Sequence, residues 1–300
     1  MIYIIANNGG DVNLHDANGK TLLMNAILRN KEPDYIRWLV NDLGADCTLL
    51  AFGSNTTALH CYAQYRENLF YFNLFFPWLT VLATLIQAGA DINAIDSMGT
   101  TPLYHAVQEG NDELVKTLLG VGADPNLSDH NSRFPLHIAI AKQRVDLMRK
   151  LVAAGADVNA PDANGYSPLH LAVRMGAGGY LAADTLIQMR NCIIDATGNH
   201  GRTPLHEAAI KGDYHHMLAL KRAGANVDSQ DANGMTPLHH AVLPPKSLDP
   251  ALTFASTSMP DMSIKDQFGR TALYYMLLRK PSVDQIRSFI QQNPTQFNVN

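Results

Sequence analysis

Apolar residues recur along this chain in pairs of short helical patterns separated by polar turns. The first pattern of each pair starts at Thr or Ser, as in "TPLYHAV" from Thr101 and "SPLHLAV" from Ser167. A Thr or Ser hydroxyl can accept a hydrogen bond from an early helical N–H, and Pro suits the first helical position. The second pattern ends at Gly, as in "VDLMRKLVAAG", where a helix commonly stops. The pattern therefore predicts units of helix, turn and helix.

The paired pattern repeats with a period near 33 residues, at intervals of 33 to 44. Such a period predicts a solenoid built from copies of one unit. We predict an all-α solenoid of about eight units that forms a single domain over residues 1–300. Residues 1–20 are expected to form a partial N-terminal repeat and hairpin. The units start near residues 21, 57, 101, 134, 167, 203, 236 and 271.

Between the units, the pattern D-x-x-G predicts a tight turn. It pairs Asp96 with Gly99, Asp162 with Gly165, and Asp231 with Gly234. Asp can hydrogen-bond its own backbone, and Gly adopts the left-handed conformation that such turns need. We therefore expect β-hairpin loops between the units.

The repeated motif T-P-L-H-x-A resembles the signature of the ankyrin repeat family, and the resemblance covers nearly the whole chain. It implies protein–protein interaction without intrinsic catalysis. It also implies that the histidine in the fourth place of the motif is structural, bonding to hydroxyls or backbone near the turn and joining one repeat to the next. These histidines are His60, His137, His170, His206 and His239.

Composition and charge do not suggest other functions. The net charge of −4 gives no basic stripe for nucleic acid, and three dispersed cysteines indicate neither disulfides nor a zinc site. The adjacent histidines at 215–216 and 239–240 lack a third ligand at helical spacing, so we expect no metal. Phosphate-loop and G-x-S-x-G motifs do not occur, and we expect neither cofactor nor enzymatic activity. A reducing cytoplasmic location is the default.

Two segments depart from the repeat pattern. The insertion at 68–78 is rich in aromatic residues, and no charge occurs from Leu69 to Ile86. A membrane span is not favoured, because Pro77 breaks the run and the later part is in register as an outer helix. The insertion either packs on its own stack, or anchors a partner through Phe72, Phe76 and Trp78, or contacts a membrane. In the irregular repeat 236–266, Pro244 ends the first helix early, and we expect a shortened second helix from Asp249.

Partner contacts are expected from the side chains that the repeat leaves free in its hairpins. Some of these residues belong to types that contribute strongly to protein interfaces, and others lie at the hairpin tips. The predicted contact residues are Met98, His130, Arg133, Tyr166, His200, Arg202, Met235 and Phe268. As a set they are mixed in charge, so the sequence does not name the partner. We predict an adaptor or scaffold for another protein. A secreted effector of an intracellular bacterium or virus, acting in the host cytosol, is one variant. The regulatory part of a larger enzyme and a membrane-associated binder are the alternatives.

The resemblance implies one further site. Ankyrin hairpin asparagines resemble substrates of an asparaginyl hydroxylase, which favours Leu eight residues before Asp-Val-Asn. The segment "LVAAGADVN", which ends at Asn159, fits this preference. Asn93 and Asn126 fit it less closely.

Overall fold

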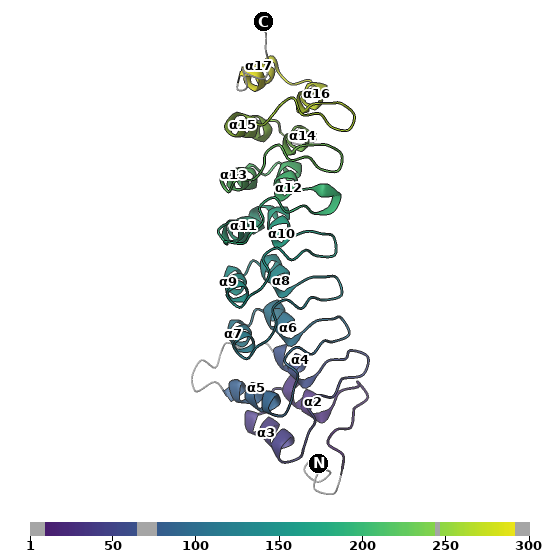
Figure 1. Ribbon diagram of the computed structural model, residues 1–300. Coiled ribbons are helices and arrows are strands. Elements are labelled where there is room, and N and C mark those ends of the chain that lie inside the picture. Colours follow the sequence, from purple (N-terminus) through teal and green to yellow (C-terminus); the bar gives the residue numbers. More distant parts are fainter. Residues whose placement is uncertain (1–9, 65–76, 244–246, 292–300) are drawn as a thin grey trace. The chain divides into compact units, whose positions relative to one another are not determined.

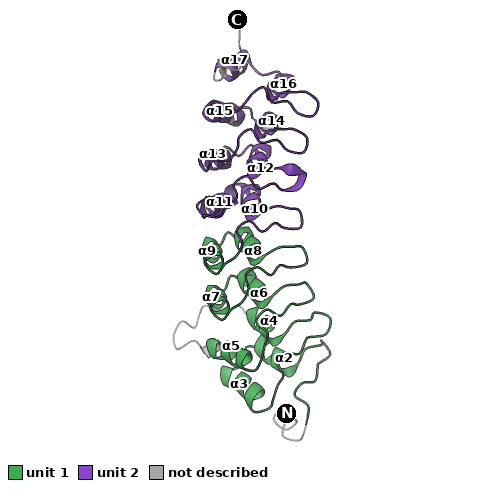
Figure 2. Cartoon of the chain, in the orientation of Figure 1, with its two compact units in different colours: residues 1–156 green, residues 157–300 purple. Residues whose placement is uncertain are grey.

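The computed structural model describes residues 10–64, 77–243 and 247–291. The chain divides into two compact units, residues 1–156 and 157–300 (Figure 2). Each unit is built from helix pairs that follow one another along the chain, with a hairpin loop before the first helix of a pair (Figure 1). We call the first helix of each pair the inner helix and the second the outer helix.

Unit 1 contains four helix pairs among its described residues. The inner helices are α2 (Leu22–Leu28), α4 (Ala58–Ala63), α6 (Pro102–Glu109) and α8 (Pro135–Ala141). The outer helices are α3 (Pro33–Asn41), α5 (Pro77–Gln87), α7 (Asp112–Gly120) and α9 (Val145–Ala153).

Unit 2 repeats the same order. Its inner helices are α10 (Pro168–Arg174), α12 (Pro204–Lys211), α14 (Pro237–Val242) and α16 (Ala272–Leu278). Its outer helices are α11 (Tyr180–Ile187), α13 (Tyr214–Arg222), α15 (Asp249–Ser258) and α17 (Val283–Gln291). Two short 3₁₀ helices, η1 (Gly176–Gly179) and η2 (Asn199–Gly201), lie in the connections.

The inner helices begin where the Thr/Ser pattern predicts. Side-chain oxygens of the residue before the helix accept a hydrogen bond from the N–H three residues on, for example from Tyr104 to Thr101 at 3.2 Å. The same cap occurs at Thr21, Thr57, Ser167, Thr203, Thr236 and Thr271. The predicted N-caps are therefore confirmed at these seven helices. Phe134 has no hydroxyl, and there the backbone N–H of Phe134 donates to His137 Nδ1 at 3.2 Å.

Within each unit, inner helices pack on the next inner helix and on their own outer helix. The Leu of the motif is buried in seven of the eight units, as at Leu103 and Leu205, which are both 0 % exposed, and it is half-buried at Leu273. Three residues later a small Ala is buried, as at Ala106 and Ala208. Burying a leucine side chain contributes about 2 kcal/mol, and the small alanine lets neighbouring helices approach closely. The core thus depends on the helical spacing that the sequence shows.

The expected all-α class is confirmed among the described residues, which contain helices and one isolated bridge between His15 and Thr21 but no strand. The alternation of helices is roughly consistent with about eight units. One expectation was wrong: α15 has 10 residues and is not shortened, because Pro250 lies in its first turn, where proline needs no N–H partner. Across the described residues, no helix is long and apolar enough to span a membrane.

Candidate functional site

The hairpin aspartates fix the loops and are not free for chemistry. Oδ1 of Asp96 accepts hydrogen bonds from the backbone N–H groups of Met98 and Thr100, both at 2.9 Å. Asp16, Asp129, Asp162, Asp231 and Asp266 repeat this pattern. Burial opposes ionisation of Asp96, but the bonds from Thr100, His105 and Met98 outweigh it and lower its pKa. The turn-forming role predicted for Asp96, Asp162 and Asp231 is therefore confirmed.

The motif histidines connect consecutive repeats. In His170, Nδ1 lies 2.9 Å from the hydroxyl of Ser167, and Nε2 lies 2.9 Å from the carbonyl oxygen of Arg202 in the next hairpin. Since the backbone N–H of Ser167 also donates to Nδ1, the proton is on Nε2, which donates to the carbonyl. His60, His206 and His239 make the equivalent pair of contacts. The structural role implied for these four histidines is confirmed.

Backbone hydrogen bonds also join neighbouring hairpin tips. In unit 1, the N–H of Phe52 donates to the carbonyl of Gly19 at 2.8 Å, and the N–H of His130 donates to that of Met98 at 3.0 Å. Gly99 has a φ of +76°, and a Cβ there would come within 2.5 Å of the His130 ring. In unit 2, the N–H groups of Ala232 and Gln267 make the matching bonds to the preceding tips. The tips are therefore held in fixed positions within each unit.

A second set of polar contacts was missed by the sequence reasoning. The residue after the motif histidine position contacts the hairpin aspartate of its own repeat. His105 Nε2 lies 3.1 Å from Asp96 Oδ2, and His240 Nε2 lies 2.8 Å from Asp231 Oδ2. Tyr275 makes the same contact with Asp266. The signal was present, because a polar aromatic residue follows the fourth place of the motif in these three repeats.

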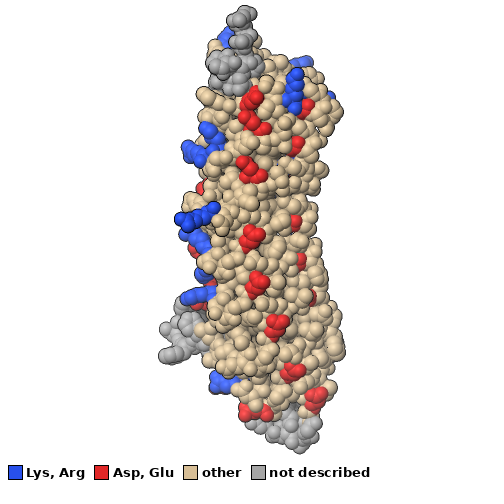
Figure 3. All heavy atoms as spheres, viewed as in Figure 1, with Lys and Arg blue, Asp and Glu red and all other residues tan. Residues whose placement is uncertain are grey.

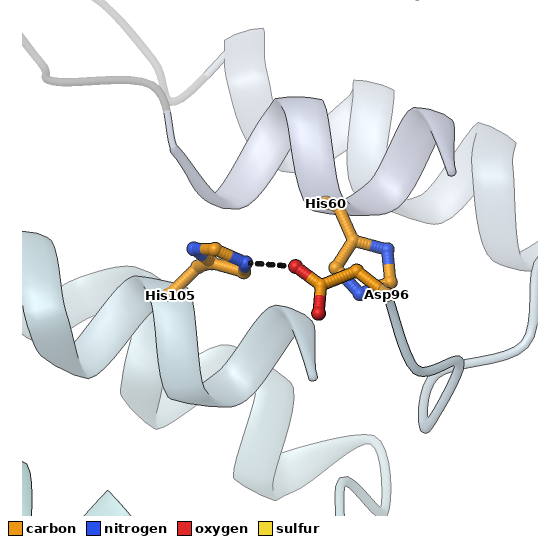
Figure 4. Close-up of side chains that lie close together, drawn as sticks. All are labelled: His60, Asp96 and His105. Atoms are coloured by element: carbon orange, nitrogen blue, oxygen red, sulfur yellow. Dashed lines mark hydrogen bonds and ion pairs between the residues drawn. The ribbon is translucent and has the colours of Figure 1, made fainter. Parts of the chain in front are cut away.

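His60, Asp96 and His105 form a cluster with the residue types and proximity of a metal site. Their three ligand atoms lie within 4.8 Å of one another, and the side chains converge in Figure 4. However, His60 Nδ1 accepts from the N–H of Thr57, so Nε2 carries the proton and donates to the Thr100 carbonyl at 3.0 Å. A metal ligand nitrogen must present a lone pair. Binding through His60 would therefore break both the helix cap and the bond to the next hairpin.

The same arrangement recurs in unit 2, which supports a structural interpretation. The rings of His60 and His105 are 5.7 Å apart at 81°, and those of His206 and His240 are 5.8 Å apart at 80°. Repetition with the architecture indicates that both clusters secure the hairpins.

Zinc is accordingly expected to leave the melting temperature at neutral pH within about 2 °C, because bound metal would stabilise the fold by mass action. Differential scanning fluorimetry with and without zinc chloride measures this. A clear rise that disappears in His105→Ala, with calcium as the control ion, would contradict the structural interpretation.

The buried His216, near the inter-helix turn of unit 2, is also structural. Asp213 caps α13, accepting from the N–H of His216 at 3.2 Å and from its Nδ1 at 2.9 Å. The hydroxyl of Tyr180 donates to the same carboxylate at 3.1 Å. These groups border an open hollow of about 550 Å³ that Lys211 and His215 also line. Because the His216 ring is 0 % exposed, it has no access to a substrate in this hollow.

The structure places the predicted contact residues in two groups. Those that are exposed are Met98, His130, Arg133, His200 and Phe268. Those that are half-buried are Tyr166, Arg202 and Met235. Phe72 and Phe76 lie outside the described residues, as does the side chain of Trp78, so the role of the insertion stays a prediction.

The hairpins of unit 1 expose apolar side chains that the sequence reasoning did not single out. Leu14, Phe52, Ile95 and Met98 are 67 %, 69 %, 58 % and 58 % exposed, and they come from three consecutive hairpins. We call these four residues the apolar row. Only Met98 was predicted, because the hairpin at Phe52 lacks the D-x-x-G pattern that locates the tip. In this hairpin the backbone N–H of Ala51 donates to the carbonyl of Thr56, whereas in the next hairpin the N–H of Asp96 donates to the carbonyl of Thr100. The loop at Phe52 is therefore one residue longer.

The asparagines proposed for hydroxylation stabilise the links between repeats. Asn159 Oδ1 accepts from the N–H of Ile193 at 2.8 Å, and its Nδ2 donates to the carbonyl of Asn191 at 2.7 Å. Asn93 accepts from the N–H of Asp124 at 2.9 Å, and Asn126 donates to the carbonyl of Gly155 at 2.9 Å. Their modification stays a prediction.

The repeated helix pairs, with hairpins that hydrogen bonds join to one another, are typical of a repeat protein that serves as an interaction module. A family model of three ankyrin repeats matches residues 55–129, 108–193 and 178–249, so the chain belongs to the ankyrin repeat family. Ankyrin repeats bind other proteins, and the fold is generally a non-enzymatic interaction module.

Comparison with solved structures agrees with this fold. The crystal structure of the ankyrin repeat domain of Bcl-3, described as a unique member of the IkappaB protein family, matches with a TM-score of 0.63. The match has 22 % sequence identity and covers 90 % of this chain and 99 % of that one. At this identity the similarity concerns the fold alone. A search of curated protein sequences found no significant match.

Proposed function

We propose that this chain is a non-catalytic adaptor that binds a partner protein through its hairpin tips and inner helices. The observation that carries the proposal is the apolar row of unit 1. Large apolar side chains exposed together on neighbouring loops are typical of protein-binding surfaces. The family supports the same conclusion, since ankyrin repeats bind other proteins.

The Phe52 side chain and the hairpin backbones that carry the apolar row are held in place before any partner binds. The Phe52 ring stacks on His15 with ring centroids 4.0 Å apart, and His15 Nε2 lies 2.9 Å from the carbonyl oxygen of Leu50. The tips are joined by backbone hydrogen bonds. Side chains that are already ordered lose little conformational entropy on binding. In addition, no charged residue occurs between Asp46 and Arg66, so this hairpin offers an uncharged surface to an apolar partner.

The proposal predicts that replacing Phe52 and Met98 by serine lowers partner recovery about tenfold, because two exposed anchors are lost. We would immobilise the full chain, retain proteins from a cell lysate, and quantify them by mass spectrometry. Val121→Ser is the matched control, since Val121 is 48 % exposed but lies at the end of outer helix α7. Circular dichroism would confirm that each variant folds.

A third variant, with Phe72, Phe76 and Trp78 changed to alanine, tests the insertion in the same assay. Loss of the partner in this variant alone would make the insertion the anchor and would remove the apolar row from the proposal. If no protein is retained specifically by the unmodified chain, the adaptor function itself fails.

A further inference from the structure

Charged residues of unit 2 are distributed unequally between two sets of segments. The hairpins and inner helices (161–175, 199–211, 231–243 and 265–280) contain seven basic residues and four acidic ones. The remaining described segments of this unit contain four basic and eight acidic residues. The basic residues of the first set are Arg174, Arg202, Lys211, Lys265, Arg270, Arg279 and Lys280. Figure 3 shows basic side chains over the hairpin that precedes α16, while acidic side chains recur along the middle of the visible face.

Burial strengthens this imbalance at the surface. Of the four acidic residues in the hairpins and inner helices, Glu207, Asp231 and Asp266 are buried, at 5 %, 6 % and 6 % exposure. The two aspartates, like the half-buried Asp162, accept hydrogen bonds from the backbone of their own turns. By contrast, Arg174 is exposed and Arg270 is half-buried. The charge that this surface presents to solvent is therefore mainly positive.

Two arginines on this surface stack on aromatic rings. The guanidinium carbon of Arg174 lies 4.3 Å from the ring centre of Tyr166, and that of Arg270 lies 4.6 Å from the ring centre of Phe268. Stacking orients the planar guanidinium and leaves its N–H groups able to bind a carboxylate at two points. Tyr166 and Phe268 were already expected to contact a partner, and the stacking joins them to the two arginines.

Three arginines of this surface, Arg174, Arg202 and Arg270, make no close hydrogen bond to a carboxylate among the described residues. Arg174 approaches Glu207 only to 3.9 Å, and Arg202 lies 3.8 Å from both Glu207 and Asp231. In unit 1, Arg133 makes contacts of 2.7 and 2.8 Å with Asp129. Arg133 uses its N–H groups to bind Asp129. The corresponding N–H groups of Arg174 and Arg270 are therefore available to bind a carboxylate of a partner.

We infer that the hairpins and inner helices of unit 2 bind an acidic, extended segment of a partner protein, with Arg174 and Arg270 holding its carboxylates. This inference rests on the proposed adaptor function and names the chemistry of the partner at this surface. Phe268 and Tyr274, which are 63 % and 46 % exposed, provide apolar contact beside Arg270.

The architecture also sets a spacing for the partner. Tyr166, on which Arg174 stacks, and Arg270 occupy the same hairpin position, directly before the capping residue, three repeats apart. With neighbouring helices about 8–10 Å apart and an extended chain rising about 3.3 Å per residue, carboxylates about seven to nine residues apart would face both arginines.

A protein segment fits this surface better than nucleic acid or an anionic membrane. The intervening hairpin and inner helix, residues 231–243, contain no basic residue, so the positive charge is interrupted. Nucleic acid carries closely and regularly spaced phosphates, and its affinity depends on neutralising many of them. Discrete arginines with adjacent aromatic rings match separate carboxylates and apolar side chains instead.

The test uses a fluorescein-labelled peptide of about twelve residues, with two glutamates about eight positions apart in a background of Ser, Gly and Tyr. Its binding to the full chain is measured by fluorescence anisotropy. Arg174→Gln combined with Arg270→Gln is expected to weaken binding about tenfold, because two charge-assisted contacts are lost. Arg202 is left unchanged, since it lies beside two buried carboxylates and its loss would destabilise the fold.

The matched control replaces Arg190 and Arg222 by glutamine. These residues follow outer helix α11 and end outer helix α13 of the same unit, so the control changes net charge equally. Equal weakening in both double variants, or equal binding of the peptide with glutamine in place of glutamate, would overturn the inference. So would tighter arginine-dependent binding of oligouridylate or of phosphatidylserine vesicles.

Failure of this inference is distinguishable from failure of the adaptor function. If the acidic peptide does not bind while the apolar row still retains a protein partner, only the assignment of an acidic segment to unit 2 is wrong.

Discussion

Replacing His170 by alanine is expected to lower the free energy of unfolding by about 3 kcal/mol. The ring is 0 % exposed, so its removal leaves a cavity in the core. It also leaves the carbonyl oxygen of Arg202 without its donor, and it removes the acceptor of the Ser167 N–H. The loss acts on two repeats together, because the histidine belongs to one and the carbonyl to the next.

Urea denaturation followed by circular dichroism measures this effect, and hydrogen exchange of the Ser167 and Leu171 amides localises it. Local measurement is needed because repeats in a solenoid unfold with different stabilities. His215→Ala is the control, since His215 is exposed and outside the motif. A change no larger than that of His215→Ala would show that the bond between repeats contributes little.

Stability is expected to fall as the pH decreases from about 6.5 to about 4, before the carboxylates titrate. Burial lowers the pKa of His60, His170 and His239, and it lowers that of His206 to about 4 from an ordinary value of 6.5. The folded chain therefore holds these rings neutral while the unfolded chain binds protons. The stabilisation is complete above pH 6.5 and is lost as the pH falls towards 4. For His206 alone the loss is about 3 kcal/mol.

The aspartates act at lower pH. The pKa values of Asp96, Asp231 and Asp266 are lowered below the ordinary 3.8, because hydrogen bonds to the ionised carboxylates outweigh the opposing effect of burial. Their stabilisation is present above pH 3.8 and is lost below it. Denaturation midpoints at several pH values between 7.5 and 4 therefore measure the histidine effect, and midpoints below pH 3.8 add the aspartate effect. His206→Ala should lower stability at pH 7.5 but reduce the further loss on acidification. If the pH dependence of stability is unchanged in this variant, His206 does not contribute to the loss of stability on acidification.

Much of the fold could be predicted from sequence because its determinants are local. A hydroxyl before Pro-Leu caps a helix wherever it occurs, and Asp-x-x-Gly closes a turn through bonds to its own backbone. The motif histidine also belongs to this class. Its ring reaches a hydroxyl three residues away and a carbonyl about one repeat away, so the repeat period places both partners.

The candidate site was predictable only in part, because exposure depends on what neighbouring repeats cover. Arg133 and Arg270 stand at the same place in their hairpins, and the sequence treats them alike. In the structure, Arg133 is bonded to Asp129, whereas Arg270 lies over Phe268 and close to Tyr275. Phe52 escaped prediction because its hairpin departs from the pattern that marks the tips. The hydroxyl of Tyr275, and not the guanidinium of Arg270, donates to the side chain of Asp266.

The sequence by itself determined the repeat, the helix starts, the turn aspartates and the structural role of the histidines, because each depends on contacts at a fixed separation along the chain. Only the tertiary structure decided which charges remain available. The hairpin acids of unit 2 are buried or half-buried and bonded to their own backbone, while Arg174 and Arg270 are stacked and make no close hydrogen bond to a carboxylate among the described residues. That difference turns a surface of mixed composition into one that presents mainly positive charge, and it arises from burial, which residue order alone does not specify.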